Sequence, residues 1–273
     1  MNILEVKNLN IRDVKSGNEI IYNSSFKLKQ GSCLAIVGES GSGKSVTCKS
    51  IMRLNTSSLR QSGDILFNGE NLNHLSEKEM RRKRGRNLYM IMQNGMSAFD
   101  PSCVIGIHVK ETLSQHFGWN HNVIDGKIKN AMESVMLKNP SEILNKYPYQ
   151  LSGGMLQRMM IALGFVLEPD IMIADEPTTS LDTISQFEVV EQFIKVRERM
   201  DCSMIFVSHD LGVVKKIADY VLVMKDGKII ERGNTQSIFS DAQHEYTKYL
   251  ISTKEELSNH FKKMMGRSYL AEN

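Results

Sequence analysis

The sequence predicts an α/β fold built on a mainly parallel sheet that is covered by helices on both faces. Short apolar runs, typical of strands buried in such a sheet, occupy residues 33–37, 171–174, 204–207 and 221–224. Stretches with helical spacing separate these runs, and strands that alternate with helices favour parallel pairing. A glycine-rich loop directly after the first run is a third sign, because open α/β sheets bind ligands where their strands end.

The first third of the chain is predicted to contain short strands separated by turns. β-rich stretches at residues 3–6 and 20–28 precede the run at 33–37, and the glycine-containing turns at 16–18 and 30–32 break them. The other elements predicted here are a helix from about residue 44 to 54 and strands at 64–67 and 88–92.

A helical segment interrupts this pattern in the middle of the chain. Between about residues 97 and 149 β-branched runs are few, and the candidate helices cover residues 111–117 and 123–137. We interpret this segment as a helical insert. From about residue 244 the chain is polar with helical character.

Composition and charge exclude several classes of protein. The 273 residues carry a formal net charge of +3, too small to require nucleic acid or an anionic membrane as a partner. The longest apolar stretch, residues 159–167, is far shorter than the ~20 residues of a membrane-spanning helix, and the first residues show no signal-peptide pattern. The four cysteines are scattered, which favours reduced thiols. We therefore expect a cytoplasmic chain that reaches any membrane through a partner.

Residues 38–45 match the pattern G-x-x-x-x-G-K-[ST] of a phosphate-binding loop, between an apolar strand and a helix. Glycines let backbone N–H groups face inward around phosphate oxygens, and the helix N-terminus adds positive charge. Lys44 is expected to reach the β- and γ-phosphates of a nucleotide, and the Ser45 hydroxyl to bind Mg²⁺. The predicted nucleotide-binding residues here are Gly38, Glu39, Ser40, Gly41, Ser42, Gly43, Lys44 and Ser45.

A pair of acids follows the apolar run at residues 171–174, at the end of a predicted buried strand. Asp175 is positioned there to hold Mg²⁺, directly or through water. Glu176 can accept a proton from an attacking water as a general base. Together with the phosphate loop, these acids predict nucleotide hydrolysis.

The segment Leu-Ser-Gly-Gly-Met-Leu-Gln-Arg at residues 151–158 resembles the signature motif of ABC (ATP-binding cassette) proteins. A Ser-Gly-Gly turn that opens a helix is itself an anion site. The resemblance implies that Ser152, Gly153 and Gly154 face the γ-phosphate of an ATP bound by a second chain, with two ATP molecules held in a head-to-tail dimer.

Three further segments match motifs of the same family, in the same order. Gln93 matches the glutamine loop, which senses the γ-phosphate and Mg²⁺ and lies next to the membrane partner. Residues 180–182, Ser-Leu-Asp, match a loop at the dimer contact. His209 matches the switch histidine, which contacts the γ-phosphate. By this resemblance the catalytic residues are Lys44, Glu176 and His209, and the Mg²⁺ ligands are Ser45, Gln93 and Asp175.

The resemblance covers roughly residues 3–252 and implies a P-loop NTPase (RecA-like) core, an antiparallel β-subdomain and an α-helical ABC subdomain. We expect one nucleotide-binding domain over residues 1–252, with the helical subdomain at about 94–158, and a polar helical tail over residues 253–273.

Finer details resemble the peptide/nickel importer branch of the family. Met155 replaces the usual glutamine of the signature, as in that branch, and the segments 97–101, 156–162 and 244–250 are also similar to it. The resemblance implies a second ABC ATPase subunit, two transmembrane permease subunits, an extracytoplasmic solute-binding protein acting indirectly, and a place on the cytoplasmic face of the cell membrane. Nucleic acid is not expected as a partner. The expected cargo is nickel, another transition metal or a metal chelate, with oligopeptide or dipeptide as the alternative.

Two other functions remain open at this point. A soluble ABC ATPase of translation or DNA repair usually carries two cassettes or a long coiled-coil insert, and neither is visible in 273 residues. A regulatory module that holds ATP without cleaving it would not need Glu176 and His209.

Three features have no assigned role. The region at residues 11–15 lacks the aromatic residue on which ABC proteins stack adenine, which leaves Tyr22 as the nearest candidate. The basic run at residues 81–86 is expected to be a solvated loop, not a nucleic-acid site. His108, His116 and His121 lack the spacing of metal ligands, so we expect no cargo-metal site there.

Overall fold

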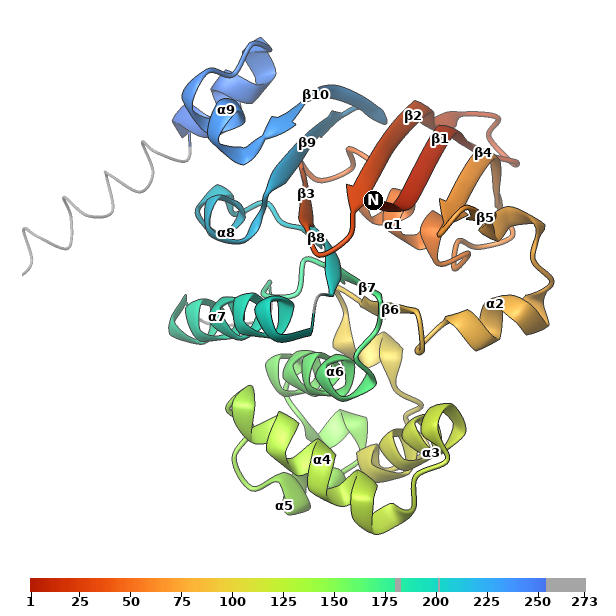
Figure 1. The fold of residues 1–273 in the computed structure, drawn as a ribbon, viewed down its shortest axis with the longest axis vertical. Helices are drawn as coiled ribbons and strands as arrows, with labels where there is room; N and C mark the ends of the chain where they lie inside the picture. Colours follow the sequence, from red (N-terminus) through yellow and green to blue (C-terminus); the bar gives the residue numbers. More distant parts are fainter. Residues whose placement is uncertain (180–182, 201, 254–273) are drawn as a thin grey trace, which may run out of the picture.

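The computed structural model describes residues 1–179, 183–200 and 202–253, and a six-stranded sheet forms their centre (Figure 1). The strand order is β10-β9-β3-β8-β7-β6. Strands β9, β3, β8, β7 and β6 pair in parallel with their neighbours in this order, and β10 pairs antiparallel with β9. The prediction of a mainly parallel sheet is therefore confirmed. The strands are β3 (Cys33–Val37), β6 (Leu88–Ile91), β7 (Ile171–Asp175), β8 (Ser203–Val207), β9 (Tyr220–Lys225) and β10 (Lys228–Asn234).

The two faces of this sheet pack against different parts of the chain. Every residue of β3, β7 and β8 is buried, and their side chains alternate between the faces. Leu34 and Ile173 contribute to a core shared with helix α1 (Lys44–Ile51) and a second sheet. Met172 and Phe206 contribute to a core shared with the helical part of the chain. Burial on both faces explains why these runs are apolar throughout.

The second sheet is antiparallel, with strand order β2-β1-β4-β5. Its strands are β1 (Asn2–Asp13), β2 (Glu19–Lys29), β4 (Leu59–Phe67) and β5 (Glu70–Asn71). A register shift between Lys7 and Asn10 of β1 lies opposite Gly63 of β4, where the strands approach closely. The antiparallel β-subdomain is thus confirmed.

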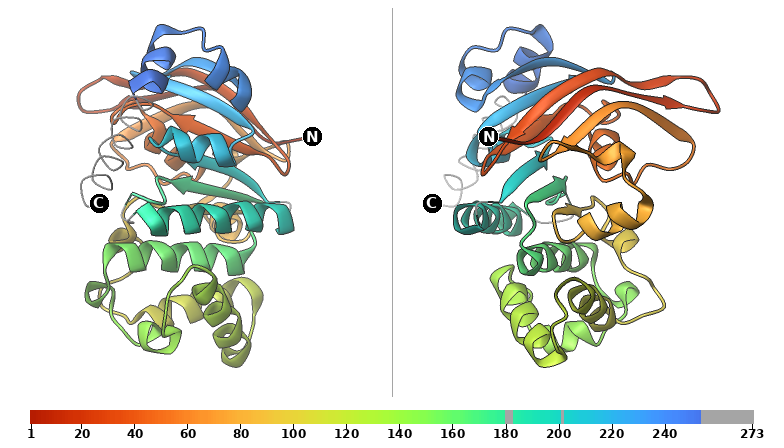
Figure 2. Two further views of the ribbon diagram at one scale, coloured as in Figure 1. Left: turned by 90° about the vertical axis from the view of Figure 1, so that its left-hand side faces the viewer. Right: turned by 45° about the vertical axis from the view of Figure 1, so that its right-hand side comes forward.

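The helical part lies on the far side of the six-stranded sheet from α1 (Figure 2). It contains α3 (Ile105–Phe117), α4 (His121–Ser134), α5 (Pro140–Leu144) and α6 (Gly153–Leu167). Helix α3 begins earlier than predicted because Ile105, Val109 and Leu113 form one buried stripe. Helix α4 ends before residue 137, since Met136 has a left-handed backbone with φ of 58°.

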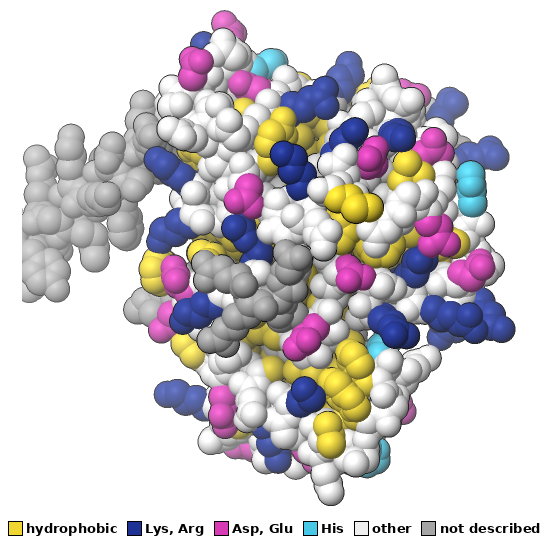
Figure 3. All heavy atoms as spheres, viewed as in Figure 1, with side chains coloured by type: hydrophobic (Ala, Val, Ile, Leu, Met, Phe, Trp, Pro, Cys, Tyr) yellow, Lys and Arg dark blue, Asp and Glu magenta, His cyan; other side chains and the backbone are white. Residues whose placement is uncertain are grey.

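The expected solvated loop at residues 81–86 is wrong for its first half. Helix α2 (Glu77–Lys83) includes Arg81 and Arg82, and Ser76 and Glu79 begin it with a reciprocal capping box. The basic residues occupy its last turn, where the helix dipole favours them. Figure 3 shows the basic side chains, in dark blue, gathered over this helix at the right of the view.

The remaining helices of the described chain are α7 (Thr183–Met200), α8 (Leu211–Ile217) and α9 (Thr235–Ser240). Short 3₁₀ turns are η1 (Leu72–His74), η2 (Gly95–Ala98) and η3 (Pro148–Gln150), and residues 245–253 are helical. No helix in the described part is long and apolar enough to cross a membrane.

Substitution by alanine should change the free energy of unfolding in opposite directions at two glycines. Gly63 has φ of 96°, and a Cβ atom there would lie 2.4 Å from the Asn8 carbonyl oxygen, so Gly63→Ala is expected to lower the free energy of unfolding by about 2–3 kcal/mol. Gly126 lies exposed within α4 with open space around it, so Gly126→Ala should raise that free energy by about 0.5–1 kcal/mol. Urea unfolding of both variants measures the two effects, and equal signs would contradict the argument.

Candidate functional site

The phosphate loop joins the end of β3 to the start of α1. A Cβ atom on Gly38 would lie 2.2 Å from the Met224 carbonyl oxygen, and one on Gly43 would lie 2.3 Å from Ile21 Cδ1. Gly43 also has φ of 99° where it begins α1. Strands β9 and β2 thus lie too close to this loop for a side chain at Gly38 or Gly43, so both positions require glycine.

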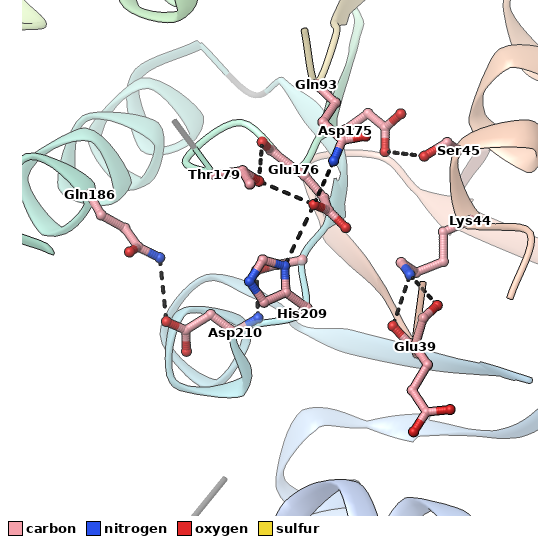
Figure 4. A network of polar contacts seen from close by, with 12 residues as sticks. Glu39, Lys44, Ser45, Gln93, Asp175, Glu176, Thr179, Gln186, His209 and Asp210 are labelled. Atoms are coloured by element: carbon pink, nitrogen blue, oxygen red, sulfur yellow. Dashed lines mark hydrogen bonds and ion pairs between the residues drawn. The ribbon is translucent and has the colours of Figure 1, made fainter. Parts of the chain in front are cut away.

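Lys44 turns its side chain back over this loop (Figure 4). Its ammonium group donates to the carbonyl oxygens of Gly38 and Glu39, each at 2.8 Å, and the side chain is buried. Burial lowers the pKa of Lys44, while the carboxylates of Glu176 and Asp175 act in the opposite direction. A buried ammonium group that is surrounded by the backbone of this loop is suited to bind a phosphate anion.

Ser45 and Asp175 meet next to the loop. The Ser45 hydroxyl donates to Asp175 Oδ1 at 2.9 Å. Ser45 lies in the first turn of α1, and Asp175 is the last residue of β7. Burial raises the pKa of Asp175, the Ser45 hydrogen bond lowers it, and the Glu176 charge raises it further. A hydroxyl and a buried carboxylate are the oxygen ligands that Mg²⁺ prefers, so these residues fit the predicted ion.

Three side chains converge on one carboxylate oxygen of Glu176 (Figure 4). Oε2 accepts hydrogen bonds from Gln93 Nε2 at 3.0 Å and from Thr179 Oγ1 at 3.1 Å, and His209 Nδ1 lies 3.5 Å away. The Glu176 backbone is left-handed, with φ of 48°, and its N–H donates to the Val207 carbonyl oxygen. This uncommon conformation turns Glu176 out of the line of β7.

His209 lies between the end of β8 and α8, and the next residue fixes that junction. The Asp210 side chain begins α8 by accepting from the N–H groups of Gly212 and Val213, and Gln186 donates to its other oxygen. His209 remains 55% exposed, so its ring faces solvent at the site.

The structure thus brings most of the predicted residues to one edge of the sheet, but not Ser152, Gly153 and Gly154. These begin α6, where Ser152 Oγ accepts from the Met155 N–H. Helix α6 packs on the sheet face opposite α1, and Ser152 and Gly153 are exposed. They are therefore available to a second molecule.

Other predicted positions have simpler outcomes. Residues 180–182 lie outside the described residues. Tyr22 is partly exposed beside Gly227, and the Lys228 ammonium lies 5.1 Å from its ring centroid. The ring of His116 packs against Gly85. In the described ranges no three His, Cys, Asp or Glu side chains are grouped to hold a metal.

Sequence reasoning did not find three residues of the site. Thr179 holds Glu176, and Tyr246 accepts a hydrogen bond from the Glu39 N–H. Gln157 is fully buried in α6 and donates to the Met92 carbonyl oxygen at 3.2 Å. Next to it, a Cβ atom on Gly95 would lie 2.9 Å from Leu156 Cβ, so the segment after Gln93 packs tightly on α6. A glutamine within an apolar helix was the available signal for Gln157.

The raised pKa of Asp175 predicts the sign of a stability effect. A carboxyl whose pKa is raised by folding holds its proton more tightly in the folded chain, so its ionised form destabilises that chain at neutral pH. Asp175→Asn stays neutral and can still accept from Ser45, so it should raise the free energy of unfolding at pH 7 by about 1 kcal/mol.

This gain should shrink as the pH falls through the raised pKa of Asp175, and it should vanish below about 4, the ordinary pKa of an aspartate, where the carboxyl is protonated in the folded and the unfolded chain alike. Denaturant unfolding at several pH values measures it, and a variant less stable than the parent at pH 7 would contradict the burial argument.

Comparison with known proteins agrees with this geometry. Residues 21–179 match the family model described as ABC transporter. The chain is 47% identical to the metal-staphylopine import system ATP-binding protein CntD of Staphylococcus aureus, over 97% of this chain and 98% of that protein. It is 42% identical to the dipeptide transport ATP-binding protein DppD of Bacillus subtilis, over 92% of this chain and 76% of that protein.

Solved structures share the fold. The dimeric ATP-binding cassette MJ0796 bound to ADP and phosphate superposes with a TM-score of 0.76 at 23% identity, over 85% of this chain and 98% of that one. CbiO1 from Clostridium perfringens superposes with a TM-score of 0.70 at 25% identity, over 88% of this chain and 91% of that one. Family model, relatives and fold agree, and this chain belongs to the ABC transporter family as one of its ATP-binding proteins.

Proposed function

We propose that this chain is the ATP-hydrolysing motor subunit of an ABC importer that takes up nickel, another transition metal or a metal chelate across the cell membrane. The observation that supports hydrolysis is the convergence of Gln93, Thr179 and His209 on Glu176, beside the phosphate loop. The observation that supports the cargo is 47% identity to a metal-staphylopine import protein over nearly the whole chain.

The phosphate loop is the proposed site for the phosphates of ATP. Those of its backbone N–H groups that have no acceptor within the protein would surround the phosphate oxygens. On binding, the Lys44 ammonium would exchange its two loop carbonyls for the phosphates, which offer stronger charge-assisted hydrogen bonds. Its lowered pKa reflects the burial that makes such a pairing favourable.

Ser45, Asp175 and Gln93 are the proposed Mg²⁺ ligands. Because Gln93 Nε2 donates to Glu176, the oxygen of its carboxamide is left for the ion. When bound, Mg²⁺ neutralises charge on the β- and γ-phosphates.

Glu176 is the proposed general base. Its carboxylate accepts a proton from a water whose oxygen attacks the γ-phosphorus, and the bond from that phosphorus to the bridging oxygen breaks, so ADP leaves. Gln93 and Thr179 hold the carboxylate in place, and its left-handed backbone directs it away from the strand. His209 is proposed to donate to the γ-phosphate as charge develops there.

A second ATPase chain would complete each site. Ser152, Gly153 and Gly154 begin a helix on the sheet face opposite α1, where Ser152 and Gly153 are exposed and Gly154 is half-buried. We propose that they contact the γ-phosphate held by a second, related subunit, as a heterodimer or homodimer. Two permease subunits would hold this pair on the cytoplasmic face of the cell membrane, and an extracytoplasmic binding protein would deliver the cargo to them.

Replacing the proposed base should abolish hydrolysis without abolishing ATP binding. Glu176→Gln keeps the shape of the side chain but cannot accept the proton, so kcat should fall by about a hundredfold or more while the Kd for ATP stays within about threefold. The measurement is phosphate release by the assembled transporter, with nucleotide titration alongside.

Glu168→Gln is the matched control. Glu168 also has a left-handed backbone, with φ of 49°, but it ends α6 away from the site. Equal rates for Glu176→Gln and the parent would rule out the assigned base.

The cargo proposal predicts which loaded binding protein stimulates the ATPase. Transporter in lipid vesicles should hydrolyse ATP several-fold faster with binding protein carrying a transition-metal chelate than with apo binding protein, because cargo delivery drives closure of the ATPase pair. Stimulation by dipeptides instead would favour the alternative cargo, which rests on 42% identity to a dipeptide transport protein.

A further inference from the structure

The last part of the described chain returns to the phosphate loop. The Tyr246 hydroxyl accepts a hydrogen bond from the backbone N–H of Glu39 at 3.0 Å, across 207 residues of sequence. The ring of Tyr246 is only 8% exposed and packs in a small core with Val37, Leu211 and Val223. The hydroxyl is therefore held at the loop by a buried ring.

The β9–β10 hairpin orients this tyrosine. The Glu231 carboxylate accepts from the N–H groups of Gln243 at 2.7 Å and His244 at 3.1 Å, which fixes the chain just before Tyr246. His244 Nδ1 then accepts from the Tyr246 N–H at 3.1 Å. The Lys225 ammonium lies 4.8 Å from the ring centroid, a cation–π contact from the other arm of the hairpin.

The same hairpin also holds the loop at a second point. The Gly227 N–H, at the tip of the hairpin, donates to the Ser42 carbonyl oxygen at 3.2 Å. Glu39 and Ser42 are thus both held from outside the loop, by Tyr246 and by Gly227. The loop amides between and after these points remain for phosphate.

We propose that Tyr246 is a positioning residue of the phosphate loop, whose hydroxyl fixes the Glu39 amide so that the loop is arranged for phosphate before nucleotide arrives. This inference rests on the proposed ATP site. An amide that already has a protein acceptor does not need phosphate as its partner. Tyr246 therefore acts on affinity through the backbone, without touching the nucleotide.

Removing the hydroxyl should weaken nucleotide binding without slowing the chemical step. Tyr246→Phe keeps the buried ring but leaves the Glu39 N–H without its acceptor, so the loop must be ordered at the moment of binding. ATP and ADP should lose affinity equally, because the loop holds phosphates that both contain. The proposed base Glu176 and the proposed donor His209 lie outside the phosphate loop, so kcat at saturation should not change.

The test compares Tyr246→Phe with Tyr249→Phe in the full chain and in the assembled transporter. Tyr249 lies on the same helical segment, is 55% exposed, and none of the described residues hydrogen-bonds to its hydroxyl. We expect Tyr246→Phe to raise the Kd for ATP, the Kd for ADP and the KM for ATP by about three- to tenfold, with kcat unchanged. Tyr249→Phe should leave all four values as in the parent, and amide hydrogen exchange at Glu39 should be faster in Tyr246→Phe alone.

Two results would overturn the inference. One is an unchanged Kd for both nucleotides in Tyr246→Phe, with or without a fall in Tm, which would reduce Tyr246 to a packing residue. The other is loss of affinity for ATP but not for ADP, which would assign Tyr246 to the γ-phosphate. The parent protein is measured first. If it does not bind ATP, the proposed function itself is wrong. If it binds ATP and Tyr246→Phe binds equally well, only this inference is wrong.

Discussion

The site depends on the parallel pairing of short strands that are buried on both faces. Strands β3, β7 and β8 each contain five residues, all buried, and Asp175 at the end of β7 is the one charged residue among them. Because the strands are parallel, their carboxyl ends meet at one edge, and the proposed functional residues lie at these ends and just beyond them. Gly38, Glu176 and His209 all lie just beyond such an end. A shift of one strand by a residue would separate them.

Burial gives these residues their electrostatic character. Asp175 and Lys44 lie near each other in a region where burial raises the pKa of the acid and lowers that of the base. Both shifts disfavour the charged forms that a nucleotide and its cation would use. The left-handed backbone of Glu176 adds strain at the same place. The fold around the site thus holds these groups in an energetically unfavourable arrangement.

Local patterns could be predicted from the sequence, and contacts between distant segments could not. The phosphate loop and the two acids at the end of β7 could be predicted because strand, turn and helix signals coincide within a few residues. Helix α2 was missed because Met80 is its only buried residue and a capping box, not an apolar stripe, begins it. The role of Tyr246 could not be predicted because its partner lies 207 residues away in the sequence. The partner is also a backbone N–H, which every residue except proline has, so no residue type marks it.

The contact between Gly95 and α6 joins the segment that follows Gln93 to the helix that Ser152 begins. Gly95 lies so close to Leu156 that there is no room for a side chain at position 95. The Gln157 side chain of α6 also donates to the Met92 carbonyl oxygen, just before Gln93. Because they pack this closely, we expect these two segments to move together. In the proposed dimer they would reach different nucleotide sites, Gln93 one site and Ser152 the other. Each site would then sense the contents of its neighbour mechanically, and the two would fill and empty in concert.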